Sequence, residues 1–431
     1  MRTSTTPADT ASHWQRRHAV RRAAAVPSPL VGAASVDAVV IGGGISGLVA
    51  ALTLRHSGAS VIVLEAGSIG DGASANGTGL VAPALRHWRA TALRRLAPMP
   101  MKRLAQRLAT SATDVRMIID AEGLSVAPRS SGLAVLRLAT SATTIPDDDV
   151  PLWNDLDIGV AVSDNSTPVG GNPARPARIW TDAFTIDPAD LVHSLAERCR
   201  AAGVRIHTRT PVLGYGRGGL RWVVTAPEGR LDARALFVAT GASADVFSHR
   251  IMPEVLESVA VTDSWYLATS PLPPHVRATI MPDDRALSIT DGDLRTLAWS
   301  SDGALLLALR PGMRRGEARA RAAAIAALAA LTGQAAAREI ERSIACIWHT
   351  PAALTPNGLP QFHAIGPDGY AWIGGEPDDI AIATLVGREI GSAILAGNTS
   401  DMVLPLTEPE PVPYRRLRNL LGLRLLPKSA G

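Results

Sequence analysis

Near the N-terminus, the pattern of apolar and polar residues predicts a strand, a helix and a second strand in close succession. The run DAVVI at residues 37–41 is apolar and β-branched, as in a buried strand. Apolar residues then recur at three- and four-residue spacing in LVAALTLRHSG, residues 48–58, which indicates a helix. A second apolar run, SVIVLE, ends at Glu65. This order is typical of a nucleotide-binding βαβ unit.

The same patterns predict helices and strands along the rest of the chain. Residues 185–214 predict a helix, a turn at Gly203 and a strand leading to Val212. Residues 380–395 keep helical spacing, so a helix should begin near Asp378 or Asp379. Further strands are predicted at 234–243, 259–272, 296–301 and 303–310, and a further helix at 317–331.

The motif GxGxxG occurs twice, and its context separates the two copies. The first, at residues 42–47, lies between the first strand and its helix. There Gly42 permits a tight turn, Gly44 lets the backbone approach a pyrophosphate, and Gly47 allows close packing of helix on strand. Glu65 follows 18 residues later and can accept hydrogen bonds from ribose hydroxyls. The second copy, at 214–219, lies between two strand patterns and predicts a hairpin turn.

Composition narrows the function classes. The chain has 431 residues, 46% of them hydrophobic, which is enough for a large core with a second lobe. The net charge is only +4, and with 4% aromatic residues and dispersed arginines we expect no nucleic-acid partner. The apolar segment at 38–54 is too short and too rich in glycine for an integral membrane segment. Two cysteines without a metal-ligand pattern favour a cytoplasmic protein with no structural metal.

Several motifs beyond the glycine turn resemble one family in their order. The chain resembles the D-amino-acid oxidase superfamily of FAD-dependent oxidoreductases, and most of all γ-glutamylputrescine oxidoreductase and glycine oxidase-like proteins. The motifs that carry the resemblance are Ser12-His13-Trp14, Gly70 to Ser74, Ile186-Asp187-Pro188, Ala239-Thr240-Gly241, Ala268 to Leu272, Trp348, Thr355 to Pro360 and Ala383 to Gly387.

The resemblance implies an α/β fold. It consists of a discontinuous Rossmann-like FAD-binding domain and an inserted α+β substrate domain built on a mixed sheet. We expect the FAD-binding domain to comprise 36–95, 182–245 and 352–400, and the substrate domain 96–181 and 246–351. Residues 1–35 form a lead-in segment. Residues 401–431 form a C-terminal tail, for which a packed terminal helix is the main expectation and contact with a membrane surface or electron-transfer partner the alternative.

The resemblance also implies where FAD binds. Glu65 would contact the adenosine ribose, the backbone of Val212 would lie near the adenine, and the loop at 74–79 would run along the flavin. The helix from Ile380 would point its N-terminus at the flavin pyrimidine ring. Asn76 stands where some relatives carry a histidine joined to the flavin, so we expect non-covalent FAD. The expected cofactor-binding residues are Gly42, Gly44, Ile45, Ser46, Gly47, Glu65, Ala66, Ser74, Asn76, Gly77, Thr78, Val212, Thr240, Gly241, Asp379 and Ile380.

The family reaction implies the activity. A hydride passes from a carbon that bears an amine nitrogen to flavin N5, giving an imine that water hydrolyses. The substrate would be a small-molecule amine or amino acid, and the electron acceptor oxygen or an electron carrier. Catalytic side chains are not determined by these patterns. Arg86, His87 and His349 are candidates, and each could equally be a solvated residue.

One stretch departs from the family pattern. Pro377-Asp378-Asp379 stands where relatives usually have Gly-His-Gly, and Thr350 replaces a usual glycine. The two aspartates could cap the helix with outward-turned side chains, since Asp is a preferred N-cap. They could instead oppose the negative charge of reduced flavin. The second interpretation leads to an alternative function, a catalytically impaired paralogue that binds a ligand or stabilises a partner.

Overall fold

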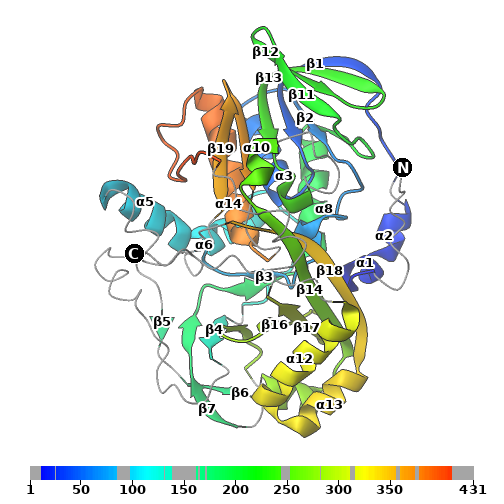
Figure 1. The fold of residues 1–431 in the computed structure, drawn as a ribbon, viewed down its shortest axis with the longest axis vertical. Helices are drawn as coiled ribbons and strands as arrows, with labels where there is room; N and C mark the ends of the chain where they lie inside the picture. The colour runs from blue at the N-terminus through cyan, green and yellow to red at the C-terminus, as the bar shows by residue number, and fades with distance from the viewer. Residues whose placement is uncertain are drawn as a thin grey trace.

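The molecule is built from two lobes, each around its own sheet (Figure 1). This computed structural model describes residues 11–24, 26–84, 98–130, 132–137, 162–163, 166–169, 172–243, 253–281, 283–310, 316–355, 360–373 and 378–409. Within these residues, each of the two large sheets has eight strands. Mixed parallel and antiparallel pairing in both sheets confirms the α/β class.

The first sheet has a parallel centre. Its parallel strands are, in spatial order, β10 (Arg205–His207), β2 (Val61–Leu64), β1 (Gly32–Ile41), β13 (Gly229–Val238) and β20 (Gly369–Ile373). Antiparallel strands complete it: β11 (Gly214–Gly218), β12 (Arg221–Thr225) and β19 (Gln361–Gly366). Both faces of β1 and β2 are buried near their C-terminal ends, which explains their continuous apolar runs.

Helices α3 (Ile45–His56), α8 (Pro188–Ala201) and α14 (Ile380–Ala396) belong to this lobe, and α3 packs against both of the others. Asp187 caps α8, accepting hydrogen bonds from the amides of Ala189 and Asp190. The remaining elements near this lobe are α1 (His13–Arg17), α2 (Ala19–Ala24), η2 (Ala73–Ala75), β3 (Leu80–Val81), α5 (Pro98–Ala109), α6 (Ser111–Ala121), β9 (Phe184–Thr185), η4 (Gly241–Ser243) and α10 (Pro253–Glu257).

The second sheet is antiparallel except where β15 and β4 pair in parallel. Its order is β18 (Ile344–Leu354), β14 (Ala260–Pro271), β17 (Ala304–Leu309), β16 (Leu294–Trp299), β15 (Ala286–Ile289), β4 (Leu133–Leu136), β8 (Arg178–Trp180) and β5 (Val162–Ser163). The other elements of this lobe are α11 (Pro274–Ile280), α12 (Glu317–Thr332), α13 (Gln334–Arg342) and the hairpin β6 (Ser166–Val169) with β7 (Asn172–Pro176).

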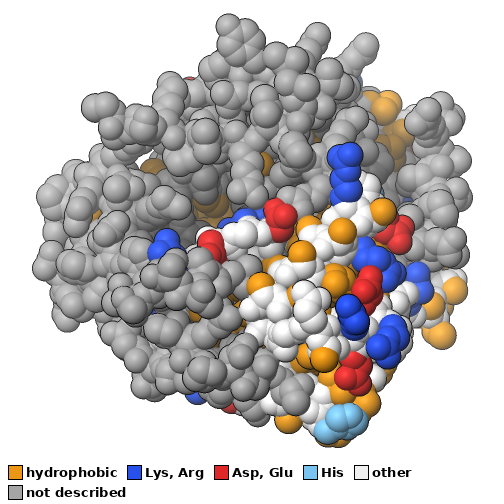
Figure 2. Space-filling view, turned by 60° about the horizontal axis from the view of Figure 1, so that its bottom comes forward, with side chains coloured by type: hydrophobic (Ala, Val, Ile, Leu, Met, Phe, Trp, Pro, Cys, Tyr) orange, Lys and Arg blue, Asp and Glu red, His pale blue; other side chains and the backbone are white. Residues whose placement is uncertain are grey.

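The two faces of the second sheet pack on different partners. Leu267, Leu305 and Leu307 belong to a core shared with α12 and α13. Tyr266, Leu306 and Trp348 belong to the core of the first lobe instead. The outer surface of α12 and α13 is solvated: Figure 2 shows side chains of both charges interspersed there, and the exposed ones include Glu317, Arg319, Arg338, Glu339 and Arg342. The sheet face that bears Tyr266, Leu306 and Trp348, called the inner face, therefore joins the two lobes.

The structure confirms the predicted elements at most positions. The second GxGxxG copy is the hairpin of β11 and β12, and α12 coincides with the predicted helix at 317–331. Strand β1 begins five residues before the predicted run. Cys199 and Cys346 are both buried and free. In the described ranges, no helix combines the length and apolarity needed to cross a membrane. The expected packing of the C-terminal tail lies beyond the described residues from 410 onward.

Candidate functional site

The first GxGxxG copy forms a tight turn between β1 and α3. Gly42 has a φ of 112°, and a Cβ there would lie 2.6 Å from the carbonyl oxygen of Ala239 on the neighbouring strand. A Cβ on Gly47 would lie 2.0 Å from the carbonyl oxygen of Gly42. Only glycine fits either position, so the backbone can bring the N-terminus of α3 to the edge of the sheet.

Glu65 lies at the C-terminal end of β2, next to this turn. Its two carboxylate oxygens accept hydrogen bonds of 2.8 Å from the amides of Gly43 and Gly67. Burial raises the pKa of Glu65 above its usual value, although these two amides favour the ionised form. The carboxylate is thus held beside the glycine turn, where a ribose hydroxyl could donate to it.

Ser74 reaches the first turn of α3 from η2. Its Oγ lies 3.3 Å from the amide nitrogen of Ile45 and accepts its hydrogen bond. A Cβ on Gly44 would come within 2.8 Å of that hydroxyl. The N-terminus of a helix favours an anion, and the Ser74 hydroxyl, which accepts from Ile45, keeps its own proton to donate to a phosphate.

Thr240 is the second residue after β13 and lies against the same turn. Its hydroxyl is buried and makes no hydrogen bond within the described part of the chain. A buried hydroxyl of this kind needs a partner. Gly241 opens η4, and Val212 lies in the core between β10 and β11. The structure therefore gathers Glu65, Ser74 and Thr240 around the glycine turn.

The loop from Ser74 to Gly79 is held by two tryptophans. Trp14 Nε1 donates to the carbonyl oxygen of Gly77 at 2.7 Å, and Trp348 Nε1 donates to that of Asn76 at 2.8 Å. The side chain of Asn76 donates to the carbonyl oxygens of Gly70 and Gly72, which precede the loop, and accepts from Ser12 Oγ. The loop conformation is therefore fixed from both lobes.

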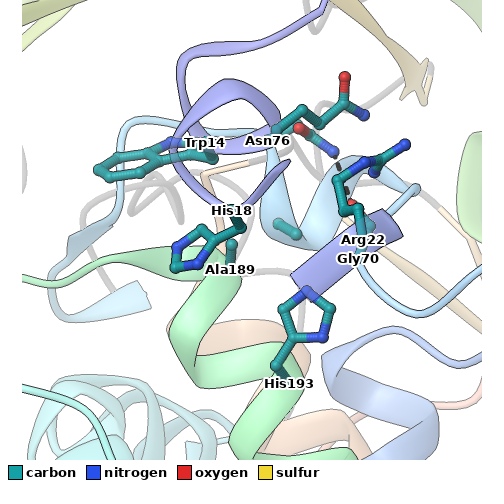
Figure 3. Close-up of a pocket in the computed structure, with 9 residues that line it drawn as sticks. Trp14, His18, Arg22, Gly70, Asn76, Ala189 and His193 are labelled. Atoms are coloured by element: carbon teal, nitrogen blue, oxygen red, sulfur yellow. Dashed lines mark hydrogen bonds between the residues drawn. The ribbon is translucent and has the colours of Figure 1, made fainter. Parts of the chain in front are cut away.

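Side chains of α1, α2 and the residue between them contact the segment before this loop and the N-cap of α8. Arg22 lies 2.5 Å from Asp71, and His18 Nε2 lies 2.9 Å from Asp187 Oδ2. Trp14, His18 and Arg22 face Gly70, Asn76 and His193 across a small cavity (Figure 3). Burial lowers the pKa of His193 to about 4.

His18, Asp187 and Asp190 lie close enough together to hold a metal ion. Arg17 and Arg21, however, pair with the same two carboxylates at 3.4 Å and 3.3 Å. Positive charge is already supplied to this cluster, so we interpret it as an ion-pair network between the lead-in helices and α8.

Asp378 and Asp379 behave differently from either sequence interpretation. Asp379 is the N-cap of α14, but its side chain makes no capping hydrogen bond in the described structure. Asp378 is 2% exposed and points inward: Oδ1 accepts from the Thr78 amide at 2.5 Å and from Thr78 Oγ1 at 3.0 Å, and Oδ2 pairs with Arg295. The prediction of outward-turned capping aspartates was wrong, because Asp378 has a buried cationic partner. Pro377 is not among the described residues.

Arg295 reaches this position because of an irregularity in β16. Leu294 pairs with Leu309 and Thr296 with Ala308, so Arg295 is one extra residue opposite β17. This β-bulge turns the Arg295 side chain away from Leu294 and Leu297, which face α12, and toward the first lobe. Burial lowers its pKa, but Asp378, Tyr266 and Asp379 raise it more, so the pKa of Arg295 stays above its usual value.

Three buried hydroxyls lie on the same face of the second sheet. Ser264 pairs with Thr350 and Tyr266 with Trp348 across β14 and β18, and the Tyr266 and Trp348 rings stack with centroids 5.5 Å apart. The hydroxyls of Ser264, Tyr266 and Thr350 are buried without a hydrogen bond of good geometry in the described chain. Burial, and then the charge of Asp378, raises the pKa of Tyr266. Tyr266 therefore stays protonated at neutral pH.

The catalytic candidates from the sequence are not brought together. His349 follows Trp348 but points to the opposite face of β18, where it pairs with Asp263 at 3.2 Å and contacts Trp265. The hydrogen bond to Asp263 raises the pKa of His349. Arg86 and His87 are not among the described residues. Sequence reasoning missed Arg295 and Tyr266; the available signal was a charged residue inside an otherwise apolar strand.

Comparison with known proteins decides the family. The family model for FAD-dependent oxidoreductases of the DAO type matches residues 37–393, most of the chain. The chain belongs to the DAO family. This membership confirms the resemblance inferred from the motifs and makes the protein an FAD-dependent oxidoreductase.

Relatives of this DAO-family protein are distant in sequence and similar in fold. The "Probable oxidoreductase OrdL" of Haemophilus influenzae is 24% identical over 386 residues, covering 85% of this chain and 84% of that protein. Glycine oxidase from Geobacillus kaustophilus has a TM-score of 0.66 at 18% identity, with 88% of this chain and 99% of that chain covered. L-proline dehydrogenase from P. horikoshii has a TM-score of 0.66 at 19% identity, with coverages of 88% and 96%.

FAD is the cofactor of the DAO family, and the residues present fit it. The turn at Gly42 and Gly47 leaves no room for side chains, and Glu65 stands at the end of β2. Ser74 extends the donor set at the start of α3, and the buried Thr240 hydroxyl lacks a partner within the described residues. These features supply polar groups around the glycine turn that suit a dinucleotide.

Proposed function

We propose that this protein oxidises the C–N bond of a small-molecule amine or amino acid. A hydride would leave the carbon that bears the nitrogen, and water would hydrolyse the resulting imine. The observation that carries the proposal is the junction between the lobes. There, the loop from Ser74 to Gly79 meets the inner face of the second sheet. Ser74 fixes the start of this loop to α3, and the sheet face bears Arg295, Tyr266 and Thr350. The FAD group, when bound, supplies the hydride acceptor.

The chain's own residues would hold the cofactor by non-covalent contacts. Glu65 would accept from the ribose, while the Ser74 hydroxyl at the start of α3 would donate to the diphosphate and Ile45 would lie beside it. The Asn76 side chain donates to the carbonyl oxygens of residues 70–72 and accepts from Ser12, which supports a structural role and no covalent link. The other expected cofactor residues, among them Ala66, Val212, Asp379 and Ile380, remain part of this proposal.

The amine donor is inferred from the named relatives. Glycine oxidase and L-proline dehydrogenase are named for amino acids, whose reacting carbon bears nitrogen. Tyr266 keeps its proton, so its hydroxyl, with those of Ser264 and Thr350, would orient a substrate nitrogen and would not act as a base. Oxygen and an electron carrier both remain candidate acceptors.

The alternative of a catalytically impaired paralogue rested on uncompensated carboxylates at the start of α14. Asp378 faces Arg295, and a paired carboxylate repels nearby negative charge far less than an isolated one. The ion pair therefore favours turnover.

Two expectations from the sequence remain predictions. One is the division into an FAD-binding domain, residues 36–95, 182–245 and 352–400, and a substrate domain, residues 96–181 and 246–351. The other is the cytoplasmic location.

The visible absorption spectrum of the purified protein tests the proposal. We expect a flavin spectrum, release of the yellow chromophore on acid precipitation, and anaerobic bleaching by at least one amine. A colourless protein that takes up no added FAD would contradict it. A flavin that dithionite reduces but no amine or amino acid reduces would favour the non-catalytic alternative.

A further inference from the structure

The Arg295–Asp378 pair is enclosed at the junction of the lobes. Arg295 is 6% exposed and Asp378 2% exposed. Asp378 comes directly before α14 and Arg295 lies on the bulge of β16, so the pair links elements from the two lobes. Breaking a buried pair by removing one partner leaves an uncompensated charge, which is strongly unfavourable.

Asp378 is fixed by more than the ion pair. Its Oδ1 accepts two hydrogen bonds from Thr78, on the loop that the proposed function places along the flavin. Its Oδ2 is left to face the guanidinium. The carboxylate cannot turn away from Arg295 without losing hydrogen bonds that hold the loop. A ligand would have to break all of these contacts to replace it.

A ligand carboxylate would meet an unfavourable field here. Asp378 and Asp379 both raise the pKa of Arg295, so two carboxylates already act on this guanidinium. A third would gain little attraction and would be repelled by both at short range. A neutral or cationic amine meets no such repulsion.

We propose that Asp378 acts as an internal carboxylate that occupies Arg295, so that the site accepts amines without a carboxylate on the reacting carbon and rejects α-amino acids. This inference rests on the proposed function and narrows its substrate class. Glycine oxidase and L-proline dehydrogenase, by their names, act on amino acids, which carry a carboxylate. In this chain the internal carboxylate of Asp378 replaces it.

Matched pairs of substrates test the inference in the wild-type holoprotein. Benzylamine and phenylglycine differ only by a carboxylate on the single carbon that bears the amine, as do methylamine and glycine. We expect anaerobic flavin reduction to be faster with the uncarboxylated member of a reactive pair by about tenfold or more, the effect of one interaction with a buried charge. Equal or faster reduction by the carboxylated member overturns the inference.

A binding measurement tests it without turnover. The variant Asp378→Asn keeps an oxygen that can accept from Thr78 but removes the charge. We expect it to bind benzoate about tenfold or more tightly than wild type does. Binding is measured by thermal shift and by the perturbation of the flavin spectrum. The double variant R295Q/D378N should lose this gain. Asp263→Asn removes a carboxylate from the opposite face of the second sheet and should change nothing.

The outcomes separate the inference from the proposed function. A folded Asp378→Asn protein that gains no benzoate affinity, or a wild type that binds benzoate equally well, overturns the role of Asp378. If no amine reduces the flavin, the proposed function fails, yet the thermal shift with benzoate still decides whether Asp378 excludes carboxylates. If Asp378→Asn does not fold, the matched pairs and benzoate binding in wild type decide.

Discussion

Trp348 donates its indole hydrogen to the carbonyl oxygen of Asn76, 272 residues earlier in the chain, at 2.8 Å. The second lobe thereby holds the loop of the first lobe by a backbone atom. The ring of Trp348 also stacks on the ring of Tyr266. The loop geometry on which cofactor binding depends is thus set from the distant strand β18.

Replacing Trp348 by Phe should loosen this loop. The ring stacking would persist, but the hydrogen bond would be lost, at a cost of about 1 kcal/mol in the free energy of unfolding. We expect weaker FAD binding as well, measured by titration of the apoprotein. Trp265→Phe is the matched control, because Trp265 lies on the neighbouring strand, faces the other way and has no indole hydrogen bond among the described residues. Equal effects of the two changes would contradict the role of Trp348.

The two GxGxxG copies should differ sharply in their tolerance of alanine. Gly47→Ala would place a Cβ 2.0 Å from a backbone oxygen, so the turn cannot keep its shape. We expect loss of bound flavin in the purified protein. Gly216→Ala, at the middle glycine of the second copy, meets open space and should leave flavin content unchanged. Flavin loss in Gly216→Ala would show that the hairpin has a part in cofactor binding.

Glu65→Gln should weaken FAD binding. The carboxylate accepts two amide hydrogen bonds, and an amide side chain would direct its own N–H groups at one of these donors. A misplaced buried donor costs about 1–3 kcal/mol, so the dissociation constant should rise about tenfold or more. The exposed Glu339→Gln on α13 controls for the change of net charge. An unaltered FAD affinity in Glu65→Gln would remove Glu65 from the ribose site.

Removing Arg295 should destabilise the protein more than removing both charges. Arg295→Met leaves Asp378 buried without its cation, which costs about 3–5 kcal/mol in the free energy of unfolding. The double variant R295M/D378N should recover a large part of that loss, because no uncompensated charge remains and the Thr78 hydrogen bonds can persist. Urea denaturation measures both. Additive losses would mean that the two side chains do not interact.

Acidification should destabilise the lead-in region through His193. Its pKa is lowered from 6.5 to about 4 by burial, so between these two values the unfolded chain binds a proton that the folded chain does not. The contribution of neutral His193 is present above pH 6.5 and is lost as the pH falls toward 4. His193→Gln should flatten the dependence of unfolding on pH in this window. The exposed His275→Gln should leave the dependence as it is.

The glycine turn was predictable because its determinants are local. A strand, three glycines, a helix and Glu65 lie within 37–65, and each residue type has a steric or hydrogen-bonding reason to be there. Trp348 and Trp14 could be noted from motifs, but which carbonyl oxygens they bind depends on the meeting of two lobes.

Arg295 was not predictable for a specific geometric reason. Regular alternation from Leu297 and Trp299 would put Arg295 on the face that packs against α12. The bulge in β16 inverts that expectation, and nothing in the residues 294–299 announces it. Without Arg295 on the inner face, the inward turn of Asp378 could not be inferred, and helix capping was the natural interpretation of that stretch.

The arrangement of the first lobe has a consequence for synthesis of the chain on the ribosome. Helix α3 is buried on nearly all sides, and part of its cover is α14, which is completed only at Ala396. Strand β1 likewise cannot pair with β13 until β13 has been synthesised, and β13 cannot pair with β20 until β20 has been synthesised. A nascent chain therefore carries an uncovered apolar helix through most of its translation, which invites chaperone binding. We expect proteins truncated before α14 to aggregate, because α14 covers the apolar surface of α3.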